Sequence, residues 1–180
     1  MNIASREFTE LGTQMVLPLF EGVDKAPNNS LNGLSRSQRS LVKDALSSGS
    51  FDGKKGKRMT LWTPGCNIVL VGMGEKDSLG HKRARNTGAR LIASMSKKKG
   101  IDVTVRFTSG WSVERMIDFA EGMLLRDYEF LEHQESPKDH ISDPWNVSFQ
   151  ASSRYQESLA RGLSKVGSVA EGVHLARDLG

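Results

Sequence analysis

A glycine turn followed by a basic segment is the part of this chain most suggestive of chemistry. The stretch Ile68-Val-Leu-Val-Gly-Met-Gly-Glu-Lys-Asp-Ser-Leu-Gly80 resembles the G-x-G-x-x-G loops that let a backbone approach a pyrophosphate. Gly72 and Gly74 fit the first two positions, but Asp77 occupies the third, where a carboxylate would repel phosphate. The P-loop pattern G-x-x-x-x-G-K-[ST] fails as well. The sequence therefore favours a plain strand-to-helix turn, with Asp77 or Ser78 capping the helix.

Other reactive residues do not fall into a catalytic or metal-binding pattern. The histidines are scattered, without an H-E-x-x-H spacing, and the G-x-S-x-G nucleophile motif is missing. They are His81, His133, His140 and His174. An acidic group in a polar loop is interpreted as solvated surface; it comprises Glu129, Glu132, Glu135 and Asp139. From these residues alone, no reaction can be assigned.

The basic residues offer a candidate binding surface. Four of them, Lys82, Arg83, Arg85 and Arg90, share one expected helix, with Lys97, Lys98 and Lys99 near its end. The simpler interpretation is a solvated helix face, and the more specific one is that those four residues contact a polyanion. A second basic segment, 52–58, is expected to form a turn. The net charge of +4 permits weak phosphate binding, whereas dedicated nucleic-acid binders concentrate positive charge more strongly.

Length and composition predict one well-buried domain without a membrane partner. The chain has 180 residues, and no apolar run approaches the ~20 residues of a membrane helix. The N-terminus lacks the layout of a secretory signal, so a cytoplasmic protein is expected. Cys66 is the only cysteine, which excludes an internal disulfide, and its place at the start of an apolar run indicates a buried, unreactive thiol.

Strands and helices alternate along the chain, which predicts an α/β layered domain. Pro64-Gly65 separates two apolar runs as in a hairpin, so the β-sheet should be mixed. Pro18 should lie at a sheet edge or near a strand end. Trp111 should open a helix with Ser112 as its N-cap, and Trp62, Trp111 and Trp145 are expected as core or lid residues. Strands are predicted at 14–20, 58–63, 67–71, 101–107 and 146–149, and helices around 41–46, at 78–98, from 111 and at 152–179.

Four segments, read together and in order, carry a resemblance to a known family. They are Phe51-Asp-Gly-Lys-Lys-Gly-Lys57, the opening stretch from Ile68, Ala120-Glu-Gly-Met-Leu-Leu-Arg-Asp-Tyr-Glu-Phe130, and Ala170-Glu-Gly-Val-His-Leu-Ala-Arg-Asp-Leu179. They are similar to the F-x-G-K-x-G-E turn, the V-G-L-G strand end, the A-x-G-x-x-L-x-x-Y-x-F segment and the G-x-x-x-A-R-D-L helix of one family. The chain thus resembles the N-terminal domain of the leucyl (cytosol) aminopeptidases.

The resemblance implies a fold and a division of labour. The fold would be macro-domain-like, with a mixed β-sheet flanked by helices and a long C-terminal helix. Residues 1–151 would form the N-terminal domain, and residues 152–180 the helix leading into a catalytic domain. In that further domain two divalent metals, zinc or manganese, would activate water to release N-terminal amino acids from peptides. The V-G-K-G-x-x-x-D-[ST]-G-G and N-T-D-A-E-G-R-L motifs that hold them are missing here, so this chain receives no catalytic, cofactor-binding or metal residue and is expected to be inactive alone.

Three hypotheses about function follow. The leading one is a non-catalytic domain that supports oligomerisation, which is hexameric in the family, and access of peptides to the active site of its own catalytic domain. The alternative is a module that binds a phosphate ligand or nucleic acid through the basic helix 81–99. The third is a structural scaffold whose C-terminal helix packs on a partner through Leu159, Leu163, Val166, Ala170 and Val173. Because the chain ends within a family motif, we expect it to be part of a longer protein.

Overall fold

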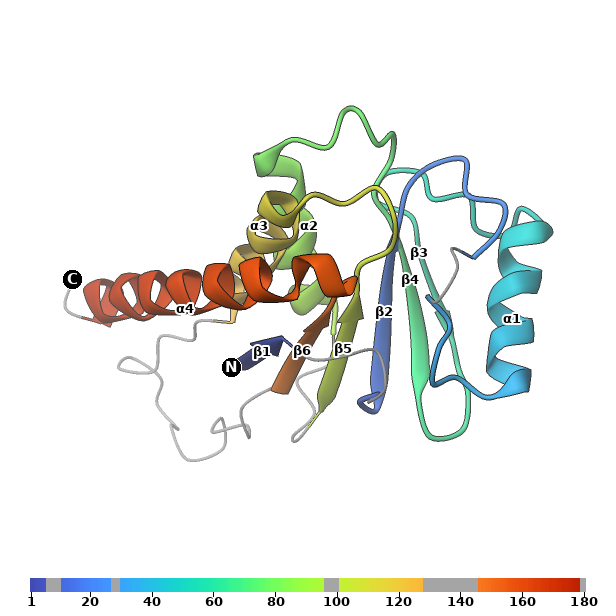
Figure 1. Ribbon diagram of the computed structural model, residues 1–180, viewed down its shortest axis with the longest axis horizontal. Helices are drawn as coiled ribbons and strands as arrows, with labels where there is room; N and C mark the ends of the chain where they lie inside the picture. Colours follow the sequence, from blue (N-terminus) through green and yellow to red (C-terminus); the bar gives the residue numbers. More distant parts are fainter. Residues whose placement is uncertain (6–10, 27–29, 96–100, 128–145, 179–180) are drawn as a thin grey trace, which may run out of the picture.

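The computed structural model describes residues 1–5, 11–26, 30–95, 101–127 and 146–178 (Figure 1). Its strands are β1 (Asn2–Ser5), β2 (Gln14–Leu19), β3 (Arg58–Leu61), β4 (Asn67–Gly72), β5 (Asp102–Arg106) and β6 (Asn146–Gln150). Its helices are α1 (Arg36–Ser47), α2 (His81–Ser94), α3 (Val113–Arg126) and α4 (Gln156–Asp178), the last preceded by a 3-10 turn at Ser153–Tyr155.

The strands form one mixed sheet in the order β1-β6-β5-β2-β4-β3. Strand β3 pairs antiparallel with β4, and the other neighbouring strands pair parallel. This confirms the predicted hairpin around Pro64-Gly65 and the mixed sheet that follows from it. Strand β1, which pairs with β6, was not expected from the sequence. The long C-terminal helix is confirmed and spans 23 residues.

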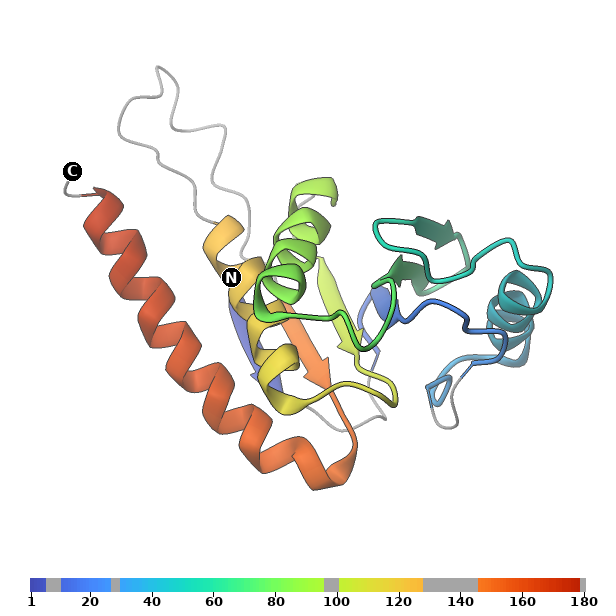
Figure 2. The same cartoon turned by 90° about the horizontal axis from the view of Figure 1, so that it is seen from above.

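Helices cover both faces of the sheet and create two hydrophobic cores. Figures 1 and 2 show α1 on one face and α2, α3 and α4 on the other. Successive side chains of β2 point to opposite faces of the sheet. Val16 packs into the core beneath α2, α3 and α4, whereas Met15 and Leu17 pack into the core beneath α1. The sheet is thus buried on both sides, which explains why the parallel strands β2 and β4 are nearly continuous apolar runs.

Strand β5 is buried on both faces although it alternates apolar and polar residues. Thr104 and Arg106 have no exposed surface. The Arg106 guanidinium donates to the carbonyl oxygens of Ser30 (3.1 Å) and Asn32 (2.6 Å) and to Gln150 Oε1 (2.8 Å). Burial lowers the pKa of Arg106 to about 10. Arg106 therefore fastens the loop that follows β2 to the sheet through hydrogen bonds to neutral oxygens.

Several local predictions are confirmed. Pro18 lies near the end of β2, beyond Val16, the last residue of β2 that pairs with β5. Ser112 is the N-cap of α3, and its hydroxyl accepts from the Arg115 N–H (3.4 Å). Trp111 is buried, 3% exposed, among Phe20, Phe107 and Phe119.

Other local predictions are wrong. Neither Asp77 nor Ser78 caps α2: the N-cap is Gly80, which offers no side-chain hydrogen bond, and the helix starts three residues later than expected at Ser78. Trp62 is neither core nor lid, since it is 78% exposed beyond the end of β3. Several residues discussed above lie outside the described part of the chain, namely Lys97, Lys98, Lys99, Glu129, Glu132, His133, Glu135, Asp139, His140 and Trp145.

Candidate functional site

The glycines at the end of β4 allow close contact between the turn that follows and the backbone of residues 53–57. A Cβ at Gly72 would lie 2.0 Å from the Lys54 carbonyl oxygen, and Gly74 adopts a φ of +74° that side chains disfavour. The N–H groups of Gly72 and Gly74 donate to the carbonyls of Lys57 (2.7 Å) and Gly53 (2.9 Å). The turn therefore docks on the 53–57 backbone, and the prediction of a strand-to-helix turn is confirmed.

This docking creates a groove between the 55–58 segment and α2. The hollow has a volume of about 550 Å³, and the buried side chains of Val71 and Leu91 contribute to its lining. Six cationic residues line it, and we call it the basic groove: Lys55, Lys57, Arg58, Lys82, Arg83 and Arg90. No acidic residue of the described chain lines it. The groove has the size of a small-molecule site, whose typical range is about 300–1,000 Å³.

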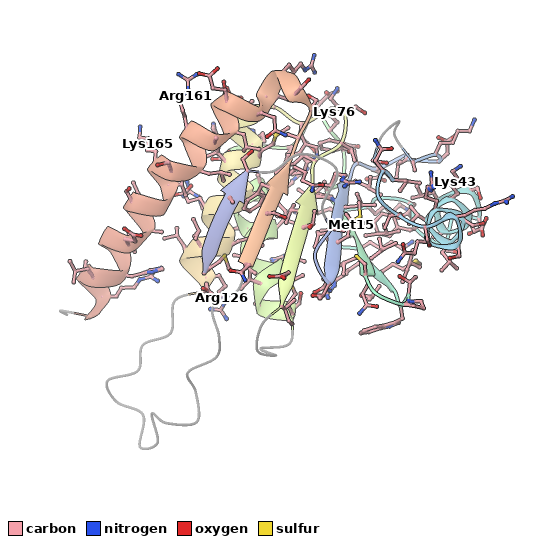
Figure 3. All side chains as sticks on the ribbon, turned by 60° about the horizontal axis from the view of Figure 1, so that its bottom comes forward. Met15, Lys43, Lys76, Arg126, Arg161 and Lys165 are labelled. Atoms are coloured by element: carbon pink, nitrogen blue, oxygen red, sulfur yellow. The ribbon has the colours of Figure 1, made fainter. Side chains whose placement is uncertain are left out.

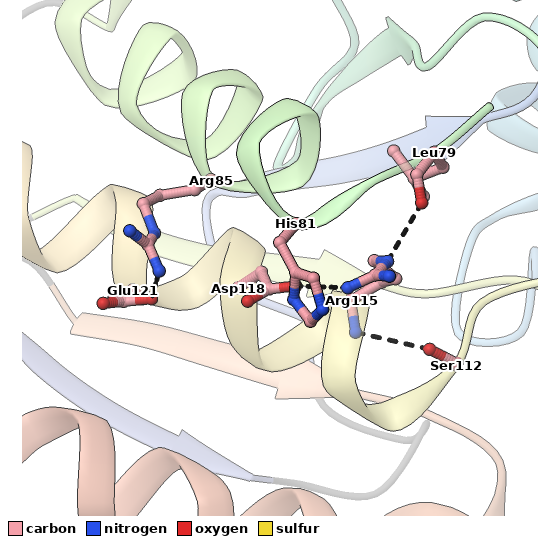
Figure 4. Close-up of polar contacts among 7 residues, drawn as sticks. All are labelled: Leu79, His81, Arg85, Ser112, Arg115, Asp118 and Glu121. Atoms are coloured by element: carbon pink, nitrogen blue, oxygen red, sulfur yellow. Dashed lines mark hydrogen bonds and ion pairs between the residues drawn. The ribbon is translucent and has the colours of Figure 1, made fainter.

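The four basic residues singled out from the sequence divide into two groups. Lys82, Arg83 and Arg90 line the groove. Arg85, on another face of α2, places its guanidinium 2.7 Å from Glu121 Oε2 on α3 (Figure 4). Whether any of them contacts a polyanion remains a prediction.

The sequence did not predict that the 55–58 segment, which lines the other side of the groove, would lie beside α2. Lys55, Lys57 and Arg58 belong to the 52–58 basic turn, which lies more than twenty positions earlier in the chain. They reach α2 because β3 pairs antiparallel with β4, which sets Arg58 opposite Val71. The hairpin signal and the glycine turn together could have predicted this neighbourhood.

Two of the six cations of the groove are held by neutral partners and one by an acid. Arg83 donates to Ser78 Oγ (2.6 Å), and Arg58 donates to Ser94 Oγ. Burial lowers the pKa of Arg58, because a desolvated guanidinium favours its neutral form. Lys57 lies 3.3 Å from Asp52 Oδ1, and a hydrogen bond from the Lys54 N–H lowers the pKa of Asp52.

A separate polar network joins the start of α2 to α3 (Figure 4). His81 Nδ1 lies 2.7 Å from Asp118 Oδ2, and the Arg115 guanidinium lies 3.0 Å from the same oxygen. Arg115 also donates from Nε to the Leu79 carbonyl (2.9 Å). These contacts fix the loop before α2 against α3, and we assign them a structural role.

The described residues do not fit the two metals that the family resemblance implies. In the part of the chain that the structure describes, no three histidine, cysteine or carboxylate side chains converge as a metal site requires. Cys66 is buried as predicted, and burial raises the pKa of its thiol. None of the described helices is both long and apolar enough to cross a membrane.

Comparison with solved structures supports the fold class. A point mutant of tomato leucine aminopeptidase superposes with a TM-score of 0.73 at 23% identity, covering 99% of this chain and 38% of that protein. The bottromycin maturation enzyme BotP superposes with a TM-score of 0.58 at 18% identity, and the match covers 93% of this chain and 32% of the BotP chain. The α/β fold is thus that of the N-terminal part of a leucine aminopeptidase.

Sequence comparison then identifies the family. The pattern of the cytosol aminopeptidase family, N-terminal domain, matches residues 16–137. A probable cytosol aminopeptidase of Nitrosococcus oceani is 24% identical over 181 residues, and one of Roseiflexus castenholzii is 25% identical over 150 residues. These matches cover 92% and 78% of this chain but 35% and 30% of the relatives. The chain belongs to the cytosol aminopeptidase family as its N-terminal domain, and it spans about a third of the length of these relatives.

Proposed function

We propose that this chain is the non-catalytic N-terminal domain of a metal-dependent aminopeptidase that releases N-terminal amino acids from peptides. The observation that carries the proposal is the family match over residues 16–137, combined with coverage of only 35% of the relative from Nitrosococcus oceani. The remaining two thirds would contain the catalytic domain, its zinc or manganese ions and the peptide site. The name of the relatives supports a cytoplasmic location.

The role of the domain would be to support assembly of a homo-oligomer and access to the active site. Helix α4 supports this view, because only part of its surface is used within the chain. Leu159 and Leu163 are buried, whereas Val169 and Leu175 are 51% and 60% exposed. Figure 2 shows the C-terminal end of α4 reaching past the strands. We propose that residues 1–151 form the domain body and that the helix in 152–180 leads toward the catalytic domain.

Two experiments test this proposal. The coding sequence beyond Gly180 should continue into lysine- and aspartate-rich metal-binding motifs, and a stop codon directly after Gly180 would contradict the proposal. Light scattering on the purified chain tests the assembly role separately. An oligomer is expected, whereas a strict monomer at high concentration would place the subunit contacts outside this chain and remove that role.

A further inference from the structure

We propose that the basic groove binds the polyphosphate group of a small molecule. This inference is independent of the aminopeptidase proposal, because it concerns a site formed entirely by this chain. The matched pair of variants described below tests it without reference to peptide hydrolysis.

The first argument is the concentration of charge. Six cations converge on one hollow from two separate segments, 55–58 and α2, and no carboxylate lines the hollow in the described residues. Within those residues, no carboxylate lies in ion-pair range of Lys55, Lys82 or Arg90, and Lys57 alone among the six pairs with an acid, Asp52. Like charges that line one hollow repel one another, so a multivalent anion in the groove would relieve the repulsion.

The second argument is the way in which two guanidinium groups are held. Arg58 and Arg83 are each hydrogen-bonded to a serine hydroxyl, Ser94 at the C-terminal end of α2 and Ser78 just before its start. A hydroxyl orients a guanidinium without cancelling its charge. Arginine forks of this kind bind phosphate oxygens in pairs, and their prior orientation reduces the entropy lost on binding.

The third argument distinguishes a small ligand from a nucleic acid. The six cations line one hollow of about 550 Å³. Such a hollow suits a compact chain of phosphates, whereas a duplex is contacted by cations spread along its backbone. Val71 and Leu91 offer apolar lining for an organic part. The phosphates could come from inorganic polyphosphate or from a nucleoside triphosphate, and the experiment separates these sources.

The test uses the 180-residue chain and two double variants with the same change in net charge. Lys82→Gln/Arg90→Gln removes two exposed cations of the groove. Lys43→Gln/Lys165→Gln removes two exposed cations on α1 and α4, labelled in Figure 3, that do not line the groove. Because all four side chains are exposed, both variants should unfold at the temperature of the original chain, which circular dichroism checks.

Isothermal titration with sodium tripolyphosphate and with ATP then measures binding. We expect one site, at least tenfold weaker binding in the groove variant, less than twofold change in the control, and a steep decline with added salt. Tighter binding of ATP would identify a nucleotide as the source of the phosphates, and tighter or equal binding of tripolyphosphate would identify inorganic polyphosphate. The proposal is overturned by equal losses in both variants, by no binding of either anion, or by binding of a short DNA duplex alone.

Discussion

At the scale of single residues, glycines set how closely α2 and α3 approach. A Cβ at Gly88 would lie 2.0 Å from the Phe119 carbonyl oxygen, and one at Gly122 would lie 1.9 Å from the Arg85 carbonyl oxygen. These are contacts with backbone atoms, which cannot rotate away as a side chain can. Gly122 belongs to the Ala120–Phe130 segment that carried the family resemblance, and the close approach gives that motif a physical reason.

Replacing Gly88 by alanine should therefore destabilise the domain. We expect Gly88→Ala to lower the free energy of unfolding by about 2–3 kcal/mol, because the helices must separate to admit the methyl group. Gly172→Ala, in α4 at a position where an added methyl group would meet nothing within 4 Å, serves as the control and should gain about 0.5–1 kcal/mol. Urea unfolding measures both; equal stabilities for the two variants would refute the packing argument.

Cys66 should behave as a protected thiol. It is 7% exposed, and burial raises its pKa, so the folded chain retains the thiol proton at a pH where the unfolded chain has lost it. The contribution of Cys66 to stability is therefore complete below the ordinary thiol pKa and falls as the pH rises above it. At pH 8 the folded chain should react with a disulfide reagent at least tenfold more slowly than the chain in urea. A similar rate in both states would contradict the burial of Cys66.

Some residue-level predictions could not succeed from sequence alone. The choice of Asp77 or Ser78 as helix cap used intrinsic preference, but Ser78 instead donates to the Glu75 carbonyl and accepts from Arg83. Trp62 was expected as a core or lid residue, yet it is 78% exposed beyond the end of the edge strand β3. Ser78 is held by partners only three and five residues away, and the exposure of Trp62 follows from its place beyond an edge strand.

At the scale of elements, helix α4 has two different halves. Leu159 and Leu163 are buried against the domain, and Gly162 closely approaches Ile117 on α3. Further along, Val169 and Leu175 are exposed while Ala170 is still buried. The predicted apolar stripe is confirmed, because Leu159, Leu163 and Ala170 are buried and Val166 and Val173 are half-buried, whereas Val169 and Leu175 lie outside it.

The two halves of α4 should respond differently to truncation of a leucine. Leu159→Ala should lower the free energy of unfolding by about 2–5 kcal/mol, because it leaves a cavity at a site with no exposed surface. Leu175→Ala, at a site that is 60% exposed, should change it by less than about 0.5 kcal/mol. Thermal or urea unfolding compares them. If Leu175→Ala proved as costly as Leu159→Ala, the exposed half of α4 would have to be covered in the isolated chain.

Elements were predictable where local signals were strong. The hairpin of β3 and β4, the Ser112 cap and the long C-terminal helix followed from turn residues, cap residues and apolar spacing. Strand β1 was missed because its four residues, Asn2–Ser5, form a strand through pairing with β6 at the other end of the chain. The basic groove was only half predicted, since the antiparallel register that joins its two segments is a property of the sheet.

At the scale of the whole molecule, the family could be predicted from four ordered segments, and the comparisons confirmed it. Two of these segments, Phe51–Lys57 and the stretch from Ile68, meet in space through the backbone contacts of Gly72 and Gly74. The chemistry of the family could not be located here, because the described residues contain no metal-binding cluster.

The most direct test of this account is the peptidase activity of the 180-residue chain. The chain should be purified from a host lacking its own leucyl aminopeptidase and assayed with leucine p-nitroanilide in the presence of manganese or zinc. We predict a rate equal to that of the metal ions alone, because no described cluster can hold the metals. Metal-dependent turnover that copurifies with the folded chain would contradict its assignment as a non-catalytic domain.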